Sequence, residues 1–165
     1  PEGELPSTQD ATSTTIMPND LLNLWQKFNT GINKIDLVAI GSPHASSAEC
    51  MKFLKLLLEK NQTVIVPTIL TVGRETLAKL RDHGSLNQLS KLGVQVVPDI
   101  CWCSITEPVF PSMTQSLITN SGKYAHYGEG LTGRNIRFGS LSDCAIAALS
   151  GFVNDELPNW LNSST

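Results

Sequence analysis

Short segments with the pattern of β-strands alternate along the chain with longer segments that have the pattern of helices. Strands are expected near residues 35–40, 63–67, 94–98 and 134–138, and a further short apolar run precedes Thr119. Apolar residues at spacings of three and four predict helices over residues 46–60 and 74–92, the second broken near Gly84. Because strands separated by helices form parallel sheets with right-handed crossovers, the sequence predicts a three-layer α/β/α fold with a mostly parallel sheet.

The start of the chain differs from the rest. Residues 1–17 are rich in Ser, Thr, Pro and Glu and contain few large apolar groups, so we expect a linker or an extended arm. An amphipathic helix follows, in which Leu21, Leu24, Trp25 and Phe28 share one face. We expect residues 18–165 to form a single α/β domain. Because the chain has no initiator Met, we also expect it to be a piece of a longer protein.

Composition narrows the classes of partner. The 165 residues include 12 Lys and Arg against 15 Asp and Glu, which gives a formal net charge of -3 and a pI near 5.5. Binding to nucleic acid requires a clustered basic surface, so this charge balance argues against that function. The sequence has no apolar run of the roughly 18 residues that a membrane span needs, and its start lacks the features of a signal peptide. We therefore expect a cytoplasmic protein that binds neither nucleic acid nor membrane.

The chain contains four cysteines, Cys50, Cys101, Cys103 and Cys144. In a reducing compartment they are expected to be thiols or metal ligands rather than disulfides. Cys50 lies within an apolar helical pattern and is interpreted as a small buried residue. Cys144 falls near a predicted helix start at about Ser140, where the helix dipole stabilises a thiolate. Cys101 lies at the end of a predicted strand.

Polar residues and glycines gather where the predicted strands end. The turn GSPHASSAEC, residues 41–50, follows the apolar run IDLVAI, and the segment TNSGKYAHYG, residues 119–128, follows another short apolar run. Open α/β sheets bind ligands at the carboxyl ends of their strands, and the helix starts found there favour anions. If these two segments end neighbouring strands, their side chains face a single crevice suited to a small anion.

These two segments, together with DIC at residues 99–101 and RFGSLSDCAIAALSG at residues 137–151, resemble the large, catalytic subunit of the aconitase X family. The resemblance covers roughly residues 21–151. Members of that family are iron-sulfur hydro-lyases, so the resemblance implies dehydration of a small hydroxy acid, either cis-3-hydroxy-L-proline or a phosphorylated mevalonate. It also implies an iron-sulfur cluster of uncertain type. The chain would then be a C-terminal fragment whose partners are the remaining half of the enzyme and a swivelling domain with a catalytic serine.

The resemblance assigns the metal to two thiols. It implies that Cys101 and Cys144 ligate iron, provided that their loops meet in space. The family pattern often has a cysteine where this chain has Ser42. Three consequences stay open: the domain lacks one ligand, it holds a different type of cluster, or Cys103 supplies the ligand.

Charge and position define the remaining candidate residues. Lys123 is a point charge suited to a carboxylate or a phosphate, and Asn120 and Ser121 offer side chains and backbone amides to the same anion. His44 is placed to bond a substrate hydroxyl or to orient a ligand. We therefore expect His44, Ser121 and Lys123 to be catalytic. The residues expected to bind the substrate are Ser42, Asn120, Ser121 and Lys123.

Two functions from different classes account for the pattern. The first is one domain of an aconitase X-type dehydratase, incomplete for catalysis by itself. The second is a non-catalytic α/β domain that binds a small anion or a partner and has lost the cluster. Taken singly, His44 and His126 are also typical of ordinary loop histidines, and Tyr124 of a packing residue. Arg137 is expected on a solvated strand, and Asp143 is as typical of a helix cap as of a metal site.

Overall fold

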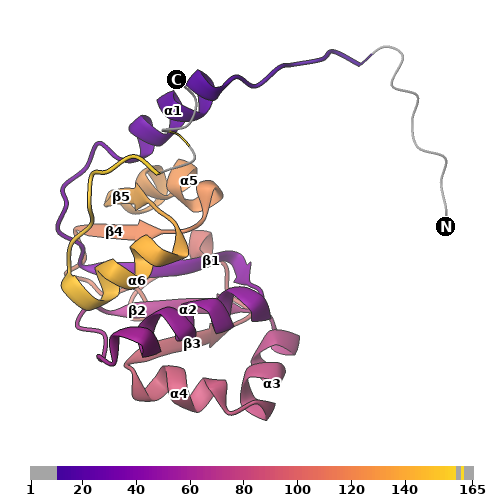
Figure 1. Ribbon diagram of the computed structural model, residues 1–165, viewed down its shortest axis with the longest axis vertical. Coiled ribbons are helices and arrows are strands. Elements are labelled where there is room, and N and C mark those ends of the chain that lie inside the picture. The colour runs from indigo at the N-terminus through magenta and orange to yellow at the C-terminus, as the bar shows by residue number, and fades with distance from the viewer. Residues whose placement is uncertain (1–10, 159–160, 162–165) are drawn as a thin grey trace.

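A parallel sheet of five strands forms the centre of the protein. The computed structural model describes residues 11–158 and residue 161, and Figure 1 shows the strands side by side. Neighbouring strands are parallel in every pair, in the order β3-β2-β1-β4-β5. The strands are β1 (Leu37–Ala45), β2 (Thr68–Val72), β3 (Val94–Pro98), β4 (Ser116–Thr119) and β5 (Asn135–Phe138). The predicted α/β class with a parallel sheet is confirmed.

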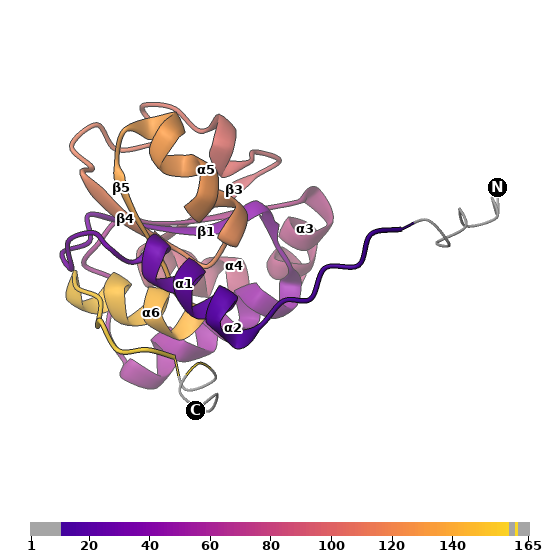
Figure 2. The same cartoon turned by 90° about the horizontal axis from the view of Figure 1, so that it is seen from above.

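Helices cover both faces of this sheet. They are α1 (Pro18–Phe28), α2 (Ser47–Lys60), α3 (Arg74–Asp82), α4 (Ser85–Lys91), α5 (Gly122–Thr132) and α6 (Leu141–Ser150), with a short 3₁₀ helix η1 (Trp102–Ser104). Figure 2 shows α5 on one side of the sheet and α2, α4 and α6 on the other. One hydrophobic core lies between the sheet and α2 and α6, and it includes Phe53 and Ala147. The other lies between the sheet and α5, and it includes Trp102 and Tyr124. The three predicted layers are therefore present.

Reciprocal side-chain caps fix the starts of two helices. At the start of α2, the Ser46 hydroxyl accepts from the backbone N–H of Glu49, and the Glu49 carboxylate accepts from that of Ser46. Ser140 and Asp143 form the same pair at the start of α6. Such caps satisfy backbone N–H groups that have no partner within the helix. Asp143 is thus a helix cap, one of the two roles expected for it.

The predicted position of the second strand is wrong. The sequence predicts a strand at residues 63–67, but β2 occupies Thr68–Val72. The backbone N–H of Ile65 donates to the carbonyl of Ala148 in α6 rather than to a neighbouring strand, and the Ile65 side chain is 69% exposed. All residues of β2 are buried. Residues 63–67 therefore form a connection, because burial on both faces selects the apolar run that follows them.

The other predicted elements agree with the structure within a few residues. Strands near residues 35–40, 94–98 and 134–138 correspond to β1, β3 and β5. The helix predicted over residues 74–92 is divided into α3 and α4 at Gly84, whose φ of 71° suits a residue without a Cβ. Among the described helices, none is long and apolar enough to cross a membrane.

The N-terminal segment reaches the sheet through α1. Trp25 and Phe28 make edge-on contacts with Phe138 of β5, with ring centroids 5.8 Å and 6.0 Å apart. Residues 11–17 are exposed and belong to no helix or strand. Residues 1–10 of the expected arm lie outside the described residues. The boundary between arm and domain stays a prediction.

Arg137 lies inside the protein, contrary to the expectation of a solvated strand. Its side chain is 3% exposed. The guanidinium donates to the carbonyl of Gly31 at 2.8 Å and to Oδ1 of Asn33 at 2.6 Å, and it forms an ion pair with Asp155. Successive residues of a strand face opposite sides of a sheet, and Ile136 faces the α5 side. Arg137 therefore points into the α6 layer, where these bonds compensate the burial of its charge.

Candidate functional site

The carboxyl ends of β1 and β4 lie side by side in the middle of the sheet. β1 pairs with β4 on one side and with β2 on the other. The order of the strands therefore changes direction at β1, and open α/β sheets bind ligands in the crevice at such a switch point. The N–H of Gly41 donates to Oδ1 of Asn120 at 3.3 Å. This contact and the pairing confirm that the two segments predicted to end neighbouring strands do so.

Gly41 allows β1 to bend at this edge. Its φ is 92°, in a region that side chains with a Cβ avoid. A Cβ here would lie 2.5 Å from Oγ1 of Thr71 and 2.8 Å from the backbone nitrogen of Ala45. The buried Thr71 hydroxyl also lies 2.9 Å from the carbonyl oxygen of Pro43, which it can bond as a donor. The close packing around Gly41 holds the residues that follow it at the edge of the sheet.

Cys101 reaches the same edge from β3. The indole Nε1 of Trp102 donates to the carbonyl of Ile40 at 3.1 Å, which anchors η1 over the end of β1. The sulfur of Cys101 lies 3.7 Å from Oγ of Ser42 and 3.7 Å from Nζ of Lys123. Three residues singled out in the sequence therefore meet at one sulfur: Ser42 near the end of β1, Cys101 just before η1, and Lys123 in the first turn of α5.

The surroundings of Cys101 favour its thiolate. Partial burial raises the pKa of this thiol, but bonds from the backbone N–H of Cys103 and from Ser42, together with the Lys123 charge, leave its pKa below the ordinary value of 9.0. Burial and the charge of Cys101 raise the pKa of the Cys103 thiol. A thiolate next to a neutral thiol is a suitable metal ligand.

Asn120 and Ser121 form the turn between β4 and α5. The Ser121 hydroxyl accepts from the backbone N–H of Tyr124 at 3.3 Å and so caps α5. The Asn120 amide donates to Oε1 of Glu49 at 3.2 Å. These bonds fix the turn that presents Lys123, whose side chain is exposed. The expected substrate-binding roles of these residues stay predictions.

The two candidate histidines occupy different surfaces. His44 is exposed in the last part of β1, at the edge that carries Cys101. Its Nδ1 lies 3.6 Å from the place that a Cβ on Gly73 would take, so the ring lies beside the loop after β2. His126 packs edge-on against Tyr127 of α5, with ring centroids 4.6 Å apart. Position therefore supports His44 as the candidate, and its catalytic role stays a prediction.

Cys144 has surroundings unlike those of Cys101. It lies in the first turn of α6, has no exposed surface and packs in the core between the sheet and α2. Burial raises the pKa of this thiol well above its ordinary value, which favours the neutral form over a metal-binding thiolate. Cys101 instead contacts Ser42 and Lys123. That Cys101 and Cys144 bind the same metal stays a prediction. The position of Cys144 in the core does not support it.

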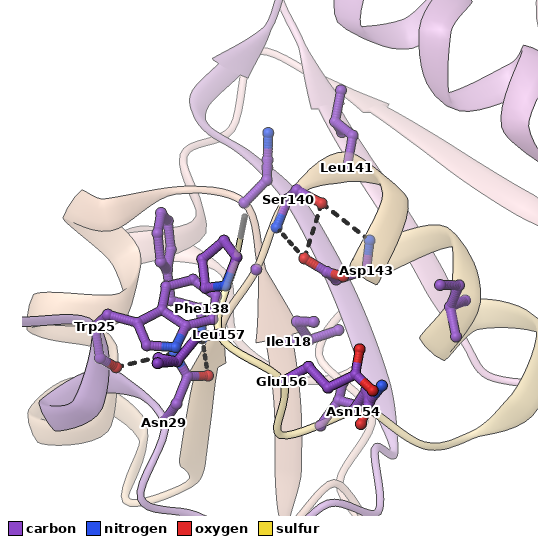
Figure 3. Close-up of a pocket in the computed structure, with 15 residues that line it drawn as sticks. Trp25, Asn29, Ile118, Phe138, Ser140, Leu141, Asp143, Asn154, Glu156 and Leu157 are labelled. Carbon is purple, nitrogen blue, oxygen red and sulfur yellow. Dashed lines mark hydrogen bonds between the residues drawn. The ribbon is translucent and has the colours of Figure 1, made fainter. Parts of the chain in front are cut away.

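A cavity of about 630 Å³ adjoins the site at Asn120. Figure 3 shows it between Trp25 of α1 and Asn29, which directly follows that helix, on one side and the start of α6, with Ser140 and Asp143, on the other. Ser140 and Asp143 are bonded to each other there, at 2.8 Å. Neither Cys101 nor Lys123 is among the described residues that line this cavity. The cavity therefore adjoins the group formed by Ser42, Cys101 and Lys123 but is separate from it.

Three residues that build the site were missed in the sequence. Glu49 belongs to the pattern S-x-x-E, which indicates a capping box and could have been found. Thr71 lies on the strand whose position was wrongly predicted. Trp102 stands between two cysteines, but no local pattern indicates that its indole bonds the carbonyl of Ile40.

The fold and the cluster of Ser42, Cys101 and Lys123 define a class of protein: an open α/β domain with a thiol and a cation at the switch point of its sheet. Residues 35–150 match the family described as the aconitase X third domain. The chain therefore belongs to the aconitase X family.

Curated relatives and a crystal structure are similar to this chain. The chain is 37% identical over 146 residues to a cis-3-hydroxy-L-proline dehydratase of Hypocrea jecorina, a match that covers 87% of this chain and 24% of the relative. The chain is 38% identical over 143 residues to the Pseudomonas aeruginosa protein of the same name, and this match covers 86% of the chain and 25% of the relative. The crystal structure of the holo-form of Thermococcus kodakaraensis aconitase X is similar to this chain, with a TM-score of 0.70 and 25% sequence identity. The match covers 89% of this chain and 38% of that structure's chain. The chain thus spans about a quarter of the length of these two curated relatives.

The sheet edge supplies part of a metal-binding set. In the part of the chain that the structure describes, no group of three or more His, Cys, Asp or Glu side chains could hold a metal ion. The sulfur donors at this edge are Cys101 and Cys103, and Ser42 offers an oxygen. Iron-sulfur clusters are held mainly by cysteine thiolates. These residues therefore fit only a share of the ligands that such a cluster needs.

Proposed function

We propose that this chain is a domain of an aconitase X-type dehydratase, which binds a small hydroxy acid and contributes Cys101 to an iron-sulfur cluster. The convergence of Ser42, Cys101 and Lys123 at the switch point carries the proposal. Membership of the aconitase X family and the dehydratase names of the relatives support it. Catalysis requires the rest of the enzyme, including the expected swivelling domain, because the chain spans about a quarter of those relatives.

The favoured substrate is cis-3-hydroxy-L-proline. The relatives named for this substrate are 37% and 38% identical to the chain. Those named phosphomevalonate dehydratase large subunit, from Thermococcus kodakarensis, Methanosarcina mazei and Methanocaldococcus jannaschii, are 28%, 30% and 26% identical. Dehydration of the hydroxyproline removes the hydroxyl as water and a proton next to the carboxylate. A site for it therefore needs a carboxylate-binding group, a group that activates the hydroxyl, and a base.

Lys123 and Ser121 are the carboxylate-binding groups in this proposal. The exposed ammonium of Lys123 supplies a charge-assisted bond. The oxygen of Ser121 accepts the capping bond from α5, so its hydroxyl proton is available to donate to the same carboxylate. Asn120 is held by Gly41 and Glu49 and keeps the turn in place. Because Lys123 also contacts Cys101, a carboxylate bound here lies next to the metal ligand.

Cys101 is the metal ligand in this proposal. A bound cluster supplies an iron that polarises the substrate hydroxyl as a Lewis acid. The polar contacts of Cys101 favour its thiolate, whereas burial keeps Cys144 neutral. Ser42 bonds the Cys101 sulfur and orients it. His44, exposed at the same edge, bonds the substrate hydroxyl or orients a ligand.

The second candidate function is a non-catalytic domain that binds a small anion or a partner. It is favoured by the lack of any group of three potential ligands within the described residues, and by Ser42 at a position where the family pattern often has a cysteine. The two functions differ in colour and metal content. A dehydratase contains iron and absorbs broadly in the visible range, whereas the second candidate is colourless and still binds a hydroxy acid.

The experiment that tests the proposal compares Lys123→Met with Lys91→Met in the full-length protein. Lys91 is exposed in the last turn of α4, ahead of the amino end of β3, and serves as the control. Calorimetric titration with cis-3-hydroxy-L-proline should show binding weakened by about 1.5–3 kcal/mol in Lys123→Met, the range for a bond to a charged group. Lys91→Met should bind like the wild type. Equal affinity in all three proteins would remove Lys123 from the site, and a preference for phosphorylated mevalonate would reverse the choice of substrate.

A further inference from the structure

The hydroxyl of Tyr124 is buried without a hydrogen-bond partner among the residues that the structure describes. Tyr124 lies on α5, and its side chain is 0% exposed. Buried side-chain polar atoms are paired in the large majority of cases, so an unpaired one requires an explanation. Packing does not explain it, because a phenylalanine would fill nearly the same space without burying a hydroxyl. The hydroxyl therefore indicates an acceptor that these residues do not supply.

Tyr124 packs against the segment that carries the two cysteines. Its ring lies on that of Trp102, with centroids 5.6 Å apart and an interplanar angle of 34°, and Trp102 stands between Cys101 and Cys103. The preceding residue, Lys123, contacts the Cys101 sulfur at 3.7 Å. Burial raises the pKa of Tyr124, and the charges of Cys103 and then Cys101 raise it further. The geometric link is the ring contact, which places Tyr124 against the residue between Cys101 and Cys103.

Two other buried polar atoms lack a partner among the described residues, and neither adjoins Cys101. The Nε atom of Arg137 belongs to a guanidinium whose other nitrogens bond Gly31, Asn33 and Asp155. The hydroxyl of Thr114 lies just before β4, at the amino end of that strand. The unpaired hydroxyl of α5 is thus the one associated with the candidate metal site.

We propose that Tyr124 is a positioning residue of this site, whose hydroxyl donates a hydrogen bond to a sulfur of the iron-sulfur group held by Cys101. The inference rests on the proposed function and deepens it. Hydrogen bonds to ligand and cluster sulfurs influence the stability and reduction potential of such groups. Lys123 approaches the Cys101 sulfur from the first turn of α5, and Ser42 approaches it from the end of β1. Tyr124 adds a donor from the buried side, beneath Trp102.

The first test measures thermal unfolding of the full-length protein after its iron has been removed under reducing conditions. Tyr124→Phe is compared with wild type and with Tyr127→Phe, a 56% exposed tyrosine on the same helix. Because the Tyr124 hydroxyl has no partner within the described chain, Tyr124→Phe should unfold at the same temperature as the wild type or a higher one. Unfolding several degrees lower would show that the hydroxyl has a structural partner in the protein and would overturn the inference.

The second test follows iron release to a chelator, and visible circular dichroism, in the iron-loaded protein. Tyr124→Phe should release iron on the order of 10-fold faster than wild type, as expected when a bond to a metal ligand is lost, and its sulfur-to-iron absorption bands should shift. Tyr127→Phe should match the wild type. Unchanged release and spectra in Tyr124→Phe would overturn this inference alone. A wild-type protein without iron would overturn the proposed function, and this inference with it.

Discussion

The ammonium of Lys123 lies 3.7 Å from the sulfur of Cys101, although the two residues follow strands that are not neighbours. Cys101 comes after β3, at one edge of the sheet, and Lys123 comes after β4, with β2 and β1 between them. The contact forms because η1 crosses the carboxyl edge of the sheet and Trp102 bonds the end of β1. The proposed metal ligand and the proposed anion-binding charge can therefore belong to one site, and a change at either residue should affect the other.

Replacing Gly41 with alanine should destabilise the protein and displace the Ser42 turn. The new Cβ would lie 2.5 Å from Oγ1 of Thr71, at a φ of 92° that alanine rarely adopts. Backbone strain of this kind costs about 1–3 kcal/mol, to which the steric clash adds. Urea denaturation followed by tryptophan fluorescence measures the change.

The matched control for that substitution is Gly130→Ala. Gly130 lies within α5 and has no atom within 4 Å of an added Cβ. Alanine is favoured over glycine in a helix by about 0.8–1.0 kcal/mol, so Gly130→Ala should be neutral or more stable than wild type. If Gly41→Ala were as stable as Gly130→Ala, the account of the β1 turn would be wrong.

Asp36 should contribute stability that is lost in acid. Partial burial raises the pKa of this carboxyl, but bonds from the backbone N–H groups of Gln115 and Ser116, and the nearby Lys34, leave its pKa below the ordinary 3.8. A carboxyl whose pKa is depressed in the folded state stabilises the protein above its unfolded pKa, and this contribution disappears as the pH falls through the folded pKa.

The measurement is the urea midpoint of wild type and Asp36→Asn between neutral pH and about pH 3, a range that spans the ordinary Asp pKa. Asp36→Asn should be less stable at neutral pH and should lose less stability on acidification, so the two curves converge. The control, Asp82→Asn, changes an exposed carboxyl at the end of α3. Parallel curves for wild type and Asp36→Asn would show that the bonds from Gln115 and Ser116 do not depend on the charge of Asp36.

Local sequence predicted the elements whose ends carry glycine or capping residues. The turn at Gly41, the break at Gly84 and the helix start near Ser140 are encoded within a few residues, and all are present. The position of β2 was missed because residues 63–67 and the strand itself are both apolar. Only packing, which exposes Ile65, distinguishes them.

The site was predicted where it depends on strand ends and missed where it depends on tertiary contacts. Parallel pairing brings the Gly41 and Asn120 segments together, as the alternation of strands and helices indicates. The sequence could not indicate that η1 carries Cys101 to Lys123. A helix start predicts a stabilised thiolate at Cys144, but this side chain faces the core, where burial raises the pKa of the thiol.

The most direct test of the central claim is the iron and acid-labile sulfide content of the full-length protein, purified without oxygen, in Cys101→Ala and Cys144→Ala. Circular dichroism establishes that both variants are folded. The account predicts that Cys101→Ala loses the iron and the visible absorption. It also predicts that Cys144→Ala retains both, because this thiol is buried in the core. Loss of iron in folded Cys144→Ala would show that this cysteine is a ligand, as the resemblance to the family implies. Iron at the wild-type level in folded Cys101→Ala would contradict the account.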